Sequence, residues 1–119
     1  MEDIKSKNDI EFLIKKFYNA LLQIDEMKPP FEGLNFEKHI PNIVQFWSFV
    51  LLEEEGYKTN VFDKHLHLPI HLPMFDIWLE VWTRTVSENF KGEKADLAIQ
   101  RAQVLTYTFK AKWEKINSK

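Results

Sequence analysis

The chain has 119 residues, which is enough for one hydrophobic core and too few for two domains. Sixteen basic and eighteen acidic side chains give a formal net charge of −2, and no basic stretch indicates a nucleic-acid partner. Cysteine is absent, which excludes disulfides, thiolate zinc sites and iron–sulfur clusters. We expect a single domain over residues 1–119, with loose tails at 1–7 and 117–119.

The sequence contains no apparent targeting or membrane segment. The first residues, MEDIKSKND, lack an apolar signal core. The longest apolar runs, such as FVLL at 49–52, are far shorter than the roughly 20 residues of a membrane span. We therefore expect a cytoplasmic protein without membrane association. Its aromatic content of 14%, with four Trp and ten Phe, suits a bulky core or a flat ligand.

Apolar residues recur at helical spacing in four segments, and no segment alternates with the period of two typical of a strand. The sequence thus predicts an all-α fold. The first predicted helix runs from about 8 to 22, with Asn8 or Asp9 as its N-cap. The second runs from about 36 to 54, with Asn35 as its N-cap.

The second half of the chain contains two further predicted helices. Residues 57–72 have weak periodicity, and we expect at most a short helix near 61–66, because the residue before a proline disfavours helical geometry. The third predicted helix runs from about Pro73 to Phe90, and proline suits its first turn. The fourth runs from about 93 to 116.

Three of the four histidines lie in the stretch HLHLPIHLP at residues 65–73, at positions 65, 67 and 71. Three imidazoles suffice for a zinc site, but this spacing matches no pattern that places ligands on one helical face. Ordinary loop histidines are the alternative. His65 differs from its neighbours because it ends a short apolar element that precedes a break.

The fourth histidine, His39, lies in the second predicted helix. Ile43 and Phe46 follow it by four and seven residues, so the three side chains share one helical face. A histidine on such a face is commonly a hydrogen-bonded core residue. Alternatively, two histidines could approach one flat, apolar cofactor from opposite sides.

Beyond these patterns, the chain resembles the group III truncated haemoglobins, in family order and spacing over about residues 8–110. The resembling stretches are FYNALL (17–22), PPF (29–31), HIPNIVQFWSFVLL (39–52), GY (56–57), KHLHLP (64–69), FDIWLEVW (75–82) and AIQRAQ (98–103). The resemblance implies a truncated globin-like two-over-two helical sandwich around non-covalently held haem b. It also implies that His65 is the proximal ligand of the haem iron.

The same resemblance implies a distal pocket on the other side of the haem. Its expected residues are Tyr18, His39 and Trp78 around the bound ligand, with Phe31 against the porphyrin and Ile43 above it. Among these side chains the indole can only donate a hydrogen bond, whereas the phenol and the imidazole can donate or accept. No residue is assigned a certain catalytic role.

The function implied by the resemblance is binding of dioxygen and other small diatomic ligands at a five-coordinate iron. Nitric oxide dioxygenation or peroxide handling, supported by an unidentified reductase, is favoured over bulk oxygen transport, and whether the protein is an enzyme stays open. Two alternatives remain from the residues alone. They are a non-haem metal module based on the histidine loop and a cofactor-free all-α interaction module.

Overall fold

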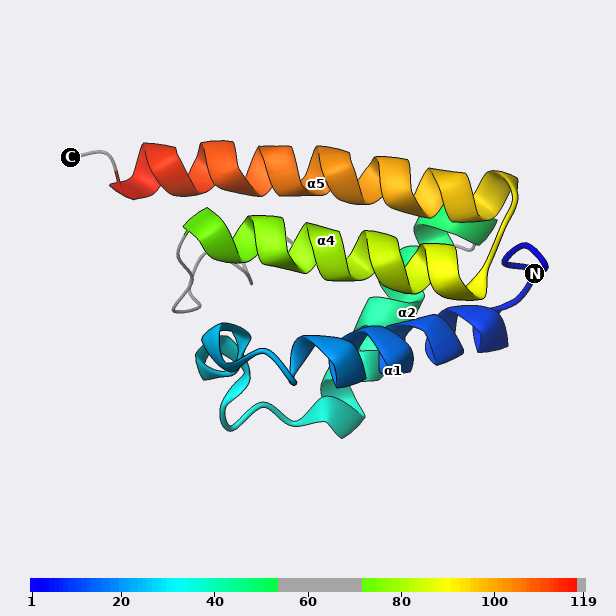
Figure 1. The fold of residues 1–119 in the computed structure, drawn as a ribbon, viewed down its shortest axis with the longest axis horizontal. Helices are drawn as coiled ribbons and strands as arrows, with labels where there is room; N and C mark the ends of the chain where they lie inside the picture. Colours follow the sequence, from blue (N-terminus) through cyan, green and yellow to red (C-terminus); the bar gives the residue numbers. More distant parts are fainter. Residues whose placement is uncertain (54–71, 118–119) are drawn as a thin grey trace.

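A computed structural model of the chain describes residues 1–53 and 72–117 (Figure 1). Their helices are α1 (Lys7–Leu21), α2 (Phe36–Leu52), α4 (Leu72–Asn89) and α5 (Glu93–Asn117), with short 3-10 turns η1 (Asp25–Met27) and η2 (Pro29–Phe31). No strand occurs in these two ranges, as the sequence predicts. None of the described helices is long and apolar enough to cross a membrane.

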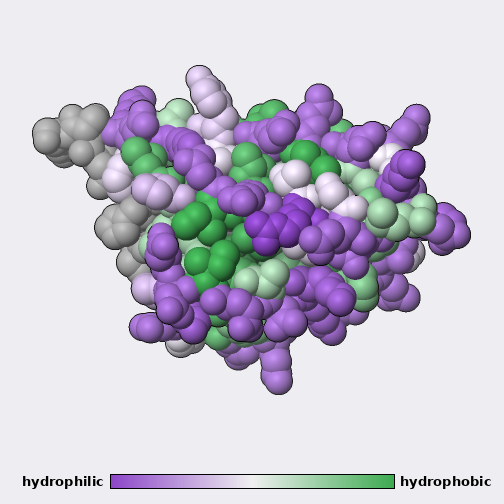
Figure 2. Space-filling model, viewed as in Figure 1, coloured by the Kyte–Doolittle hydropathy of each residue, from purple (hydrophilic) through white to green (hydrophobic). Residues whose placement is uncertain are grey.

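The helices pack as two pairs, α1 with α2 and α4 with α5, and the two pairs are in contact. The antiparallel helices α4 and α5 lie side by side, and α1 packs along the opposite side of α4 (Figure 1). The helix α2 crosses behind α1 and α4 at a steep angle (Figure 1). The core residues between the pairs are Ile10, Leu13, Ile14, Phe17, Leu21, Val44, Trp47, Leu51, Val81, Trp82, Val86, Ala98 and Ala102. Polar side chains cover most of the face seen in Figure 2, around a smaller hydrophobic area.

The start of α1 differs from the predicted one. Ser6 is the N-cap, and its Oγ accepts a hydrogen bond from the backbone N–H of Asp9 at 3.3 Å. The prediction that Asn8 or Asp9 caps this helix is therefore wrong. Both residues lie inside the first turn, where Asp9 instead accepts a hydrogen bond from the backbone N–H of Lys5 at 2.9 Å.

The start of α2 is the predicted one, and its end comes slightly earlier than expected. Oδ1 of Asn35 accepts a hydrogen bond from the backbone N–H of Glu37 at 3.0 Å, which satisfies one of the free amides of the first turn. The helix ends at Leu52 because Glu53 adopts a left-handed conformation, with φ 57° and ψ 25°. Left-handed residues commonly end helices, usually as glycine.

The later helices agree with the sequence within one residue at each end. α4 spans 72–89 where 73–90 was predicted, and α5 spans 93–117 where 93–116 was predicted. The short helix expected near 61–66 lies outside the described residues.

The N-terminal segment is docked on the beginning of α5, which differs from the loose tail expected over 1–7. The carboxylate of Asp3 accepts hydrogen bonds from the backbone N–H groups of Lys94 and Ala95, both at 2.9 Å, and so caps α5 from more than 90 residues away. Ile4 is buried in the core. A Cβ at Gly92, whose φ is +144°, would lie 2.5 Å from Cγ of Asp3, so this docking requires glycine there.

Candidate functional site

A hydrogen bond joins Tyr18 near the end of α1 to His39 in the first part of α2. The Tyr18 Oη and His39 Nε2 atoms are 2.7 Å apart. Tyr18 is buried, whereas His39 is half-buried. The crossing of α1 and α2 thus places two expected distal residues, 21 positions apart in the chain, in direct contact.

The protonation state of Tyr18 follows from its burial, which raises the pKa of the phenol well above its ordinary value. The hydroxyl therefore stays neutral at physiological pH. A neutral phenol can donate to Nε2 of His39 or accept from it, depending on the imidazole tautomer. When the imidazole donates, the hydroxyl hydrogen of Tyr18 is available to a ligand.

Two phenylalanine rings enclose this pair. The ring centroids of Phe31 and Phe36 lie 5.7 and 5.5 Å from that of Tyr18, and both rings meet it edge-to-face. Phe31 comes from η2 and Phe36 from the first residue of α2. The expected residue Phe31 thus lies directly beside the Tyr18–His39 pair.

Trp78 on α4 is connected to the same cluster through Phe17. The Phe17 ring centroid is 5.2 Å from that of Tyr18 and 5.6 Å from that of Trp78. Ile43 lies one turn after His39 on α2, and both Ile43 and Trp78 are half-buried side chains packed against the core. Tyr18, His39 and Phe31 are therefore in contact, and Trp78 is one ring removed.

Phe17 and Phe36 belong to this cluster although neither was among the residues expected in the site. Their spacing in the sequence could have indicated that they lie near the site. Phe17 immediately precedes Tyr18, and Phe36 lies three residues, nearly one helical turn, before His39. That spacing predicts proximity only once the helix positions are known.

The predicted iron ligand His65 lies outside the described residues, as do His67 and His71. Within residues 1–53 and 72–117, no three His, Asp or Glu side chains are grouped in a way that could hold a metal ion. The described residues thus include those expected on the distal side but not the predicted iron ligand.

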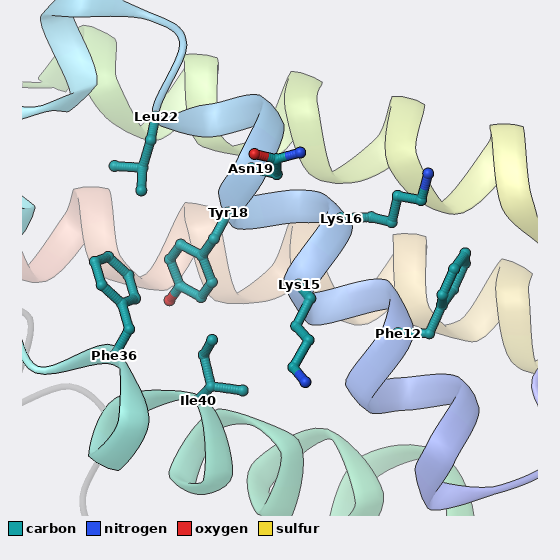
Figure 3. Close-up of a pocket in the computed structure, with 8 residues that line it drawn as sticks. All are labelled: Phe12, Lys15, Lys16, Tyr18, Asn19, Leu22, Phe36 and Ile40. Atoms are coloured by element: carbon teal, nitrogen blue, oxygen red, sulfur yellow. The ribbon is translucent and has the colours of Figure 1, made fainter.

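A groove of about 490 Å³ lies on the outer side of the contact between α1 and α2 (Figure 3). Its lining residues are Phe12, Lys15, Lys16, Tyr18, Asn19, Leu22, Phe36 and Ile40. Tyr18 points from α1 toward α2, between Phe36 and Ile40 (Figure 3). The groove shares Tyr18 and Phe36 with the candidate site, whereas Phe31, His39, Ile43 and Trp78 do not line it.

Comparison with known proteins identifies a relative of similar sequence and fold. No protein-family model matches the chain. A curated protein of Campylobacter jejuni subsp. jejuni serotype O:2, "Group 3 truncated hemoglobin ctb", is 26% identical over 111 residues, which cover 87% of each chain. The crystal structure of a group III truncated haemoglobin from Campylobacter jejuni matches with a TM-score of 0.85, at 26% identity over 95% of each chain.

The fold is therefore the all-α truncated globin fold, as expected from the sequence. The similarity of both sequence and structure is specifically to group III truncated haemoglobins, which confirms the resemblance found from the sequence motifs.

Proposed function

We propose that this chain is a haem b-binding truncated globin that binds dioxygen and other small diatomic ligands, with His65 as the proximal iron ligand. The observation that carries the proposal is the Tyr18–His39 hydrogen bond, which places two polar groups within an otherwise apolar, aromatic cluster. The similarity to truncated haemoglobins over nearly the whole chain supports the same function.

The described side chains fit a flat apolar group with a small polar ligand. Phe31, Ile43 and Trp78 are apolar or aromatic, half-buried, and carried by three different elements around the Tyr18–His39 pair. Phe31 and Ile43 would pack against the porphyrin. When bound, haem supplies an iron atom that takes up the ligand and exchanges electrons. His65 would hold it through one ring nitrogen while the other donates to a hydrogen-bond acceptor.

The distal side chains would act as hydrogen-bond donors to the ligand. Trp78 presents an N–H group that can only donate, and Tyr18 presents a hydroxyl that stays protonated because burial raises its pKa. His39 would orient that hydroxyl through the 2.7 Å contact. Each bond in a dry pocket contributes about 1 kcal/mol, so two bonds slow ligand release by roughly tenfold or more.

Slow release suits conversion of the ligand better than oxygen transport. We therefore propose that the site converts nitric oxide and dioxygen to nitrate, or handles peroxide, with electrons from an unidentified reductase. The cytoplasmic location expected from the sequence belongs to this proposal.

The proximal assignment is tested by the visible spectrum of the full chain after addition of hemin. We expect a Soret band in the wild type and its loss or displacement in His65→Ala. His67→Ala and His71→Ala are the matched controls from the same stretch and should keep the wild-type band. A wild-type spectrum in His65→Ala would remove this ligand, and a colourless wild type would favour the cofactor-free or non-haem alternatives.

The reaction is tested by the turnover of nitric oxide by the oxygenated, reduced protein and by the consumption of hydrogen peroxide. Tyr18→Phe and Trp78→Phe should each slow whichever reaction the wild type performs and speed release of dioxygen. Tyr107→Phe, which changes a phenol that is 76% exposed, is the control. Unchanged rates in both distal variants would contradict the donor roles assigned to these residues.

A further inference from the structure

Three of the four tryptophans form one continuous stack between α2 and α4. The Trp47 and Trp82 ring centroids are 4.5 Å apart with an interplanar angle of 21°. Trp78 lies one turn before Trp82 on α4, with parallel rings and centroids 5.9 Å apart. The indoles of Trp47 and Trp82 therefore overlap face to face, and Trp78 extends the stack along α4.

The two ends of the stack differ in exposure. Trp47 at one end is 2% exposed and Trp82 in the middle is 0% exposed, whereas Trp78 at the other end is half-buried. Phe17 packs edge-on against both Trp78 and Trp82, and its other neighbour is Tyr18 of the distal pair. The stack thus begins beside the candidate haem pocket and ends in the driest part of the core.

The hydrogen bond of Trp82 determines what happens to its proton upon oxidation. Nε1–H of Trp82 donates to the backbone carbonyl of Ala98 on α5 at 3.1 Å. A peptide carbonyl accepts a hydrogen bond without taking the proton, so an oxidised Trp82 would keep it and carry a positive charge. That charge would be stabilised by the carbonyl dipole and by the π-face of Trp47, because cations are attracted to indole faces.

We propose that the Trp47–Trp82 pair is a one-electron oxidation site, reached from the candidate haem pocket through Trp78. The inference rests on the proposed haem and peroxide chemistry. Reduction of one hydrogen peroxide molecule to two water molecules takes two electrons and two protons. The haem, when bound, would supply one electron and Trp82 the other, by transfer through Trp78, so that the product on the protein is a tryptophan cation radical. An external reductant then returns both electrons, one to Trp82 and one to the haem, and solvent supplies both protons.

The structural premise is tested without haem. Stacked indoles couple electronically, so the near-ultraviolet circular dichroism of the unloaded chain should contain a coupled tryptophan signal. Trp82→Phe, which breaks both stacking contacts, should remove it, and Trp47→Phe should weaken it because the Trp78–Trp82 contact remains. Trp113→Phe, which changes the fourth tryptophan, should retain it. Far-ultraviolet spectra report whether each variant is folded. Trp47→Phe leaves the Trp82–Ala98 hydrogen bond in place and is the second variant should Trp82→Phe fail to fold.

The redox role is tested on the hemin-loaded full chain mixed with hydrogen peroxide and frozen within milliseconds to seconds. Electron paramagnetic resonance should detect a tryptophan radical that retains its Nε1 proton coupling. Trp82→Phe should abolish this signal, Trp47→Phe should reduce its yield or lifetime, and Trp113→Phe should preserve it. Peptide mass spectrometry should find oxidation products at Trp47 or Trp82 after repeated peroxide additions.

Different results would contradict the proposed function and the tryptophan inference. A chain that gives no Soret band overturns the proposed function and this inference together. A chain that binds hemin but consumes no peroxide overturns the inference and leaves nitric oxide dioxygenation as the proposed reaction. A chain that binds hemin and consumes peroxide, yet forms no tryptophan radical, overturns the inference alone. A radical that persists unchanged in both Trp82→Phe and Trp47→Phe has the same consequence.

Discussion

Oη of Tyr18 lies 2.7 Å from Nε2 of His39, and this contact joins α1 to α2 inside an aromatic cluster. Both side chains are polar, so replacing either one with an apolar residue removes this hydrogen bond from the other. The pair therefore contributes to the packing of the two helices as well as to the proposed chemistry.

A double-mutant cycle measures the coupling in this pair. Tyr18→Phe and His39→Leu should each lower the free energy of unfolding, and the double variant should lose less than the sum. We expect a coupling of about 1 kcal/mol, the usual net contribution of one hydrogen bond. Urea unfolding of the unloaded chain provides the four values, with Tyr107→Phe as the exposed control. Strict additivity of the two losses would contradict the contact.

The burial of Tyr18 also predicts that the folded chain loses stability at alkaline pH. Burial raises the pKa of Tyr18 above the ordinary phenol value of 10.0, so the unfolded chain ionises this phenol first. The stabilisation is complete below pH 10 and is lost as pH rises from there toward the folded-state pKa. Unfolding free energies measured between pH 8 and about 11 should therefore fall more steeply for the wild type than for Tyr18→Phe. Equal slopes would indicate that this hydroxyl titrates normally.

Asp3 predicts a loss of stability in acid. Desolvation acts to raise the pKa of this carboxyl, but hydrogen bonds from the backbone N–H groups of Lys94, Ala95 and Ile4, together with the Lys94 charge, outweigh it and hold the pKa below 3.8. The stabilisation is present above pH 3.8, the unfolded-state value, and is lost as pH falls through the folded-state pKa.

Two substitutions at Asp3 distinguish how much its hydrogen bonds and how much its charge contribute to the free energy of unfolding. Asp3→Ala should lower the free energy of unfolding at pH 7 by about 1 kcal/mol, as loss of an N-cap does. Asp3→Asn keeps an acceptor of the same shape, so it should lose less and show no acid dependence from this site. Urea unfolding at pH 7 and at about pH 3 provides the comparison. An Asp3→Ala variant as stable as the wild type would show that the docked segment does not hold α5.

Ser48 predicts a stabilising substitution. Its Oγ is buried within α2 and makes no hydrogen bond to the described residues. Thr85 is also buried within a helix, but its Oγ1 donates a hydrogen bond to the carbonyl of Val81 at 2.7 Å. A buried polar group without a partner costs about 1–3 kcal/mol, and alanine has the higher helix propensity. Ser48→Ala should therefore raise the melting temperature, and Thr85→Val should not. A lower melting temperature for Ser48→Ala would show that its hydroxyl has a partner.

The helices themselves could be predicted from the sequence because their determinants are local. Apolar spacing placed both ends of α4 and α5 within one residue, and the side chain of Asn35 caps α2 from the adjacent position. The cap of α1 was misplaced because Ser6 and Asn8 have similar capping preferences, and only the path of the backbone decides between them.

The residues expected in the distal pocket could be named from the sequence only through family resemblance. Tyr18 and His39 are 21 positions apart, and nothing in local spacing predicts that their side chains touch. The crossing of α1 and α2, fixed by burial of their apolar faces, decides that contact. The proximal residue, His65, remains a prediction outside the described part of the chain.

By itself, then, the sequence determined the helical class, the approximate helix boundaries and the family to which the chain is similar, because periodicity and motif order are properties of neighbouring residues. Only the tertiary structure decided that Asp3 caps α5, that Trp47 stacks on Trp82 and that Tyr18 bonds to His39. Each of these contacts joins segments far apart in the chain. Their geometry depends on how the helices cross when the common core is packed.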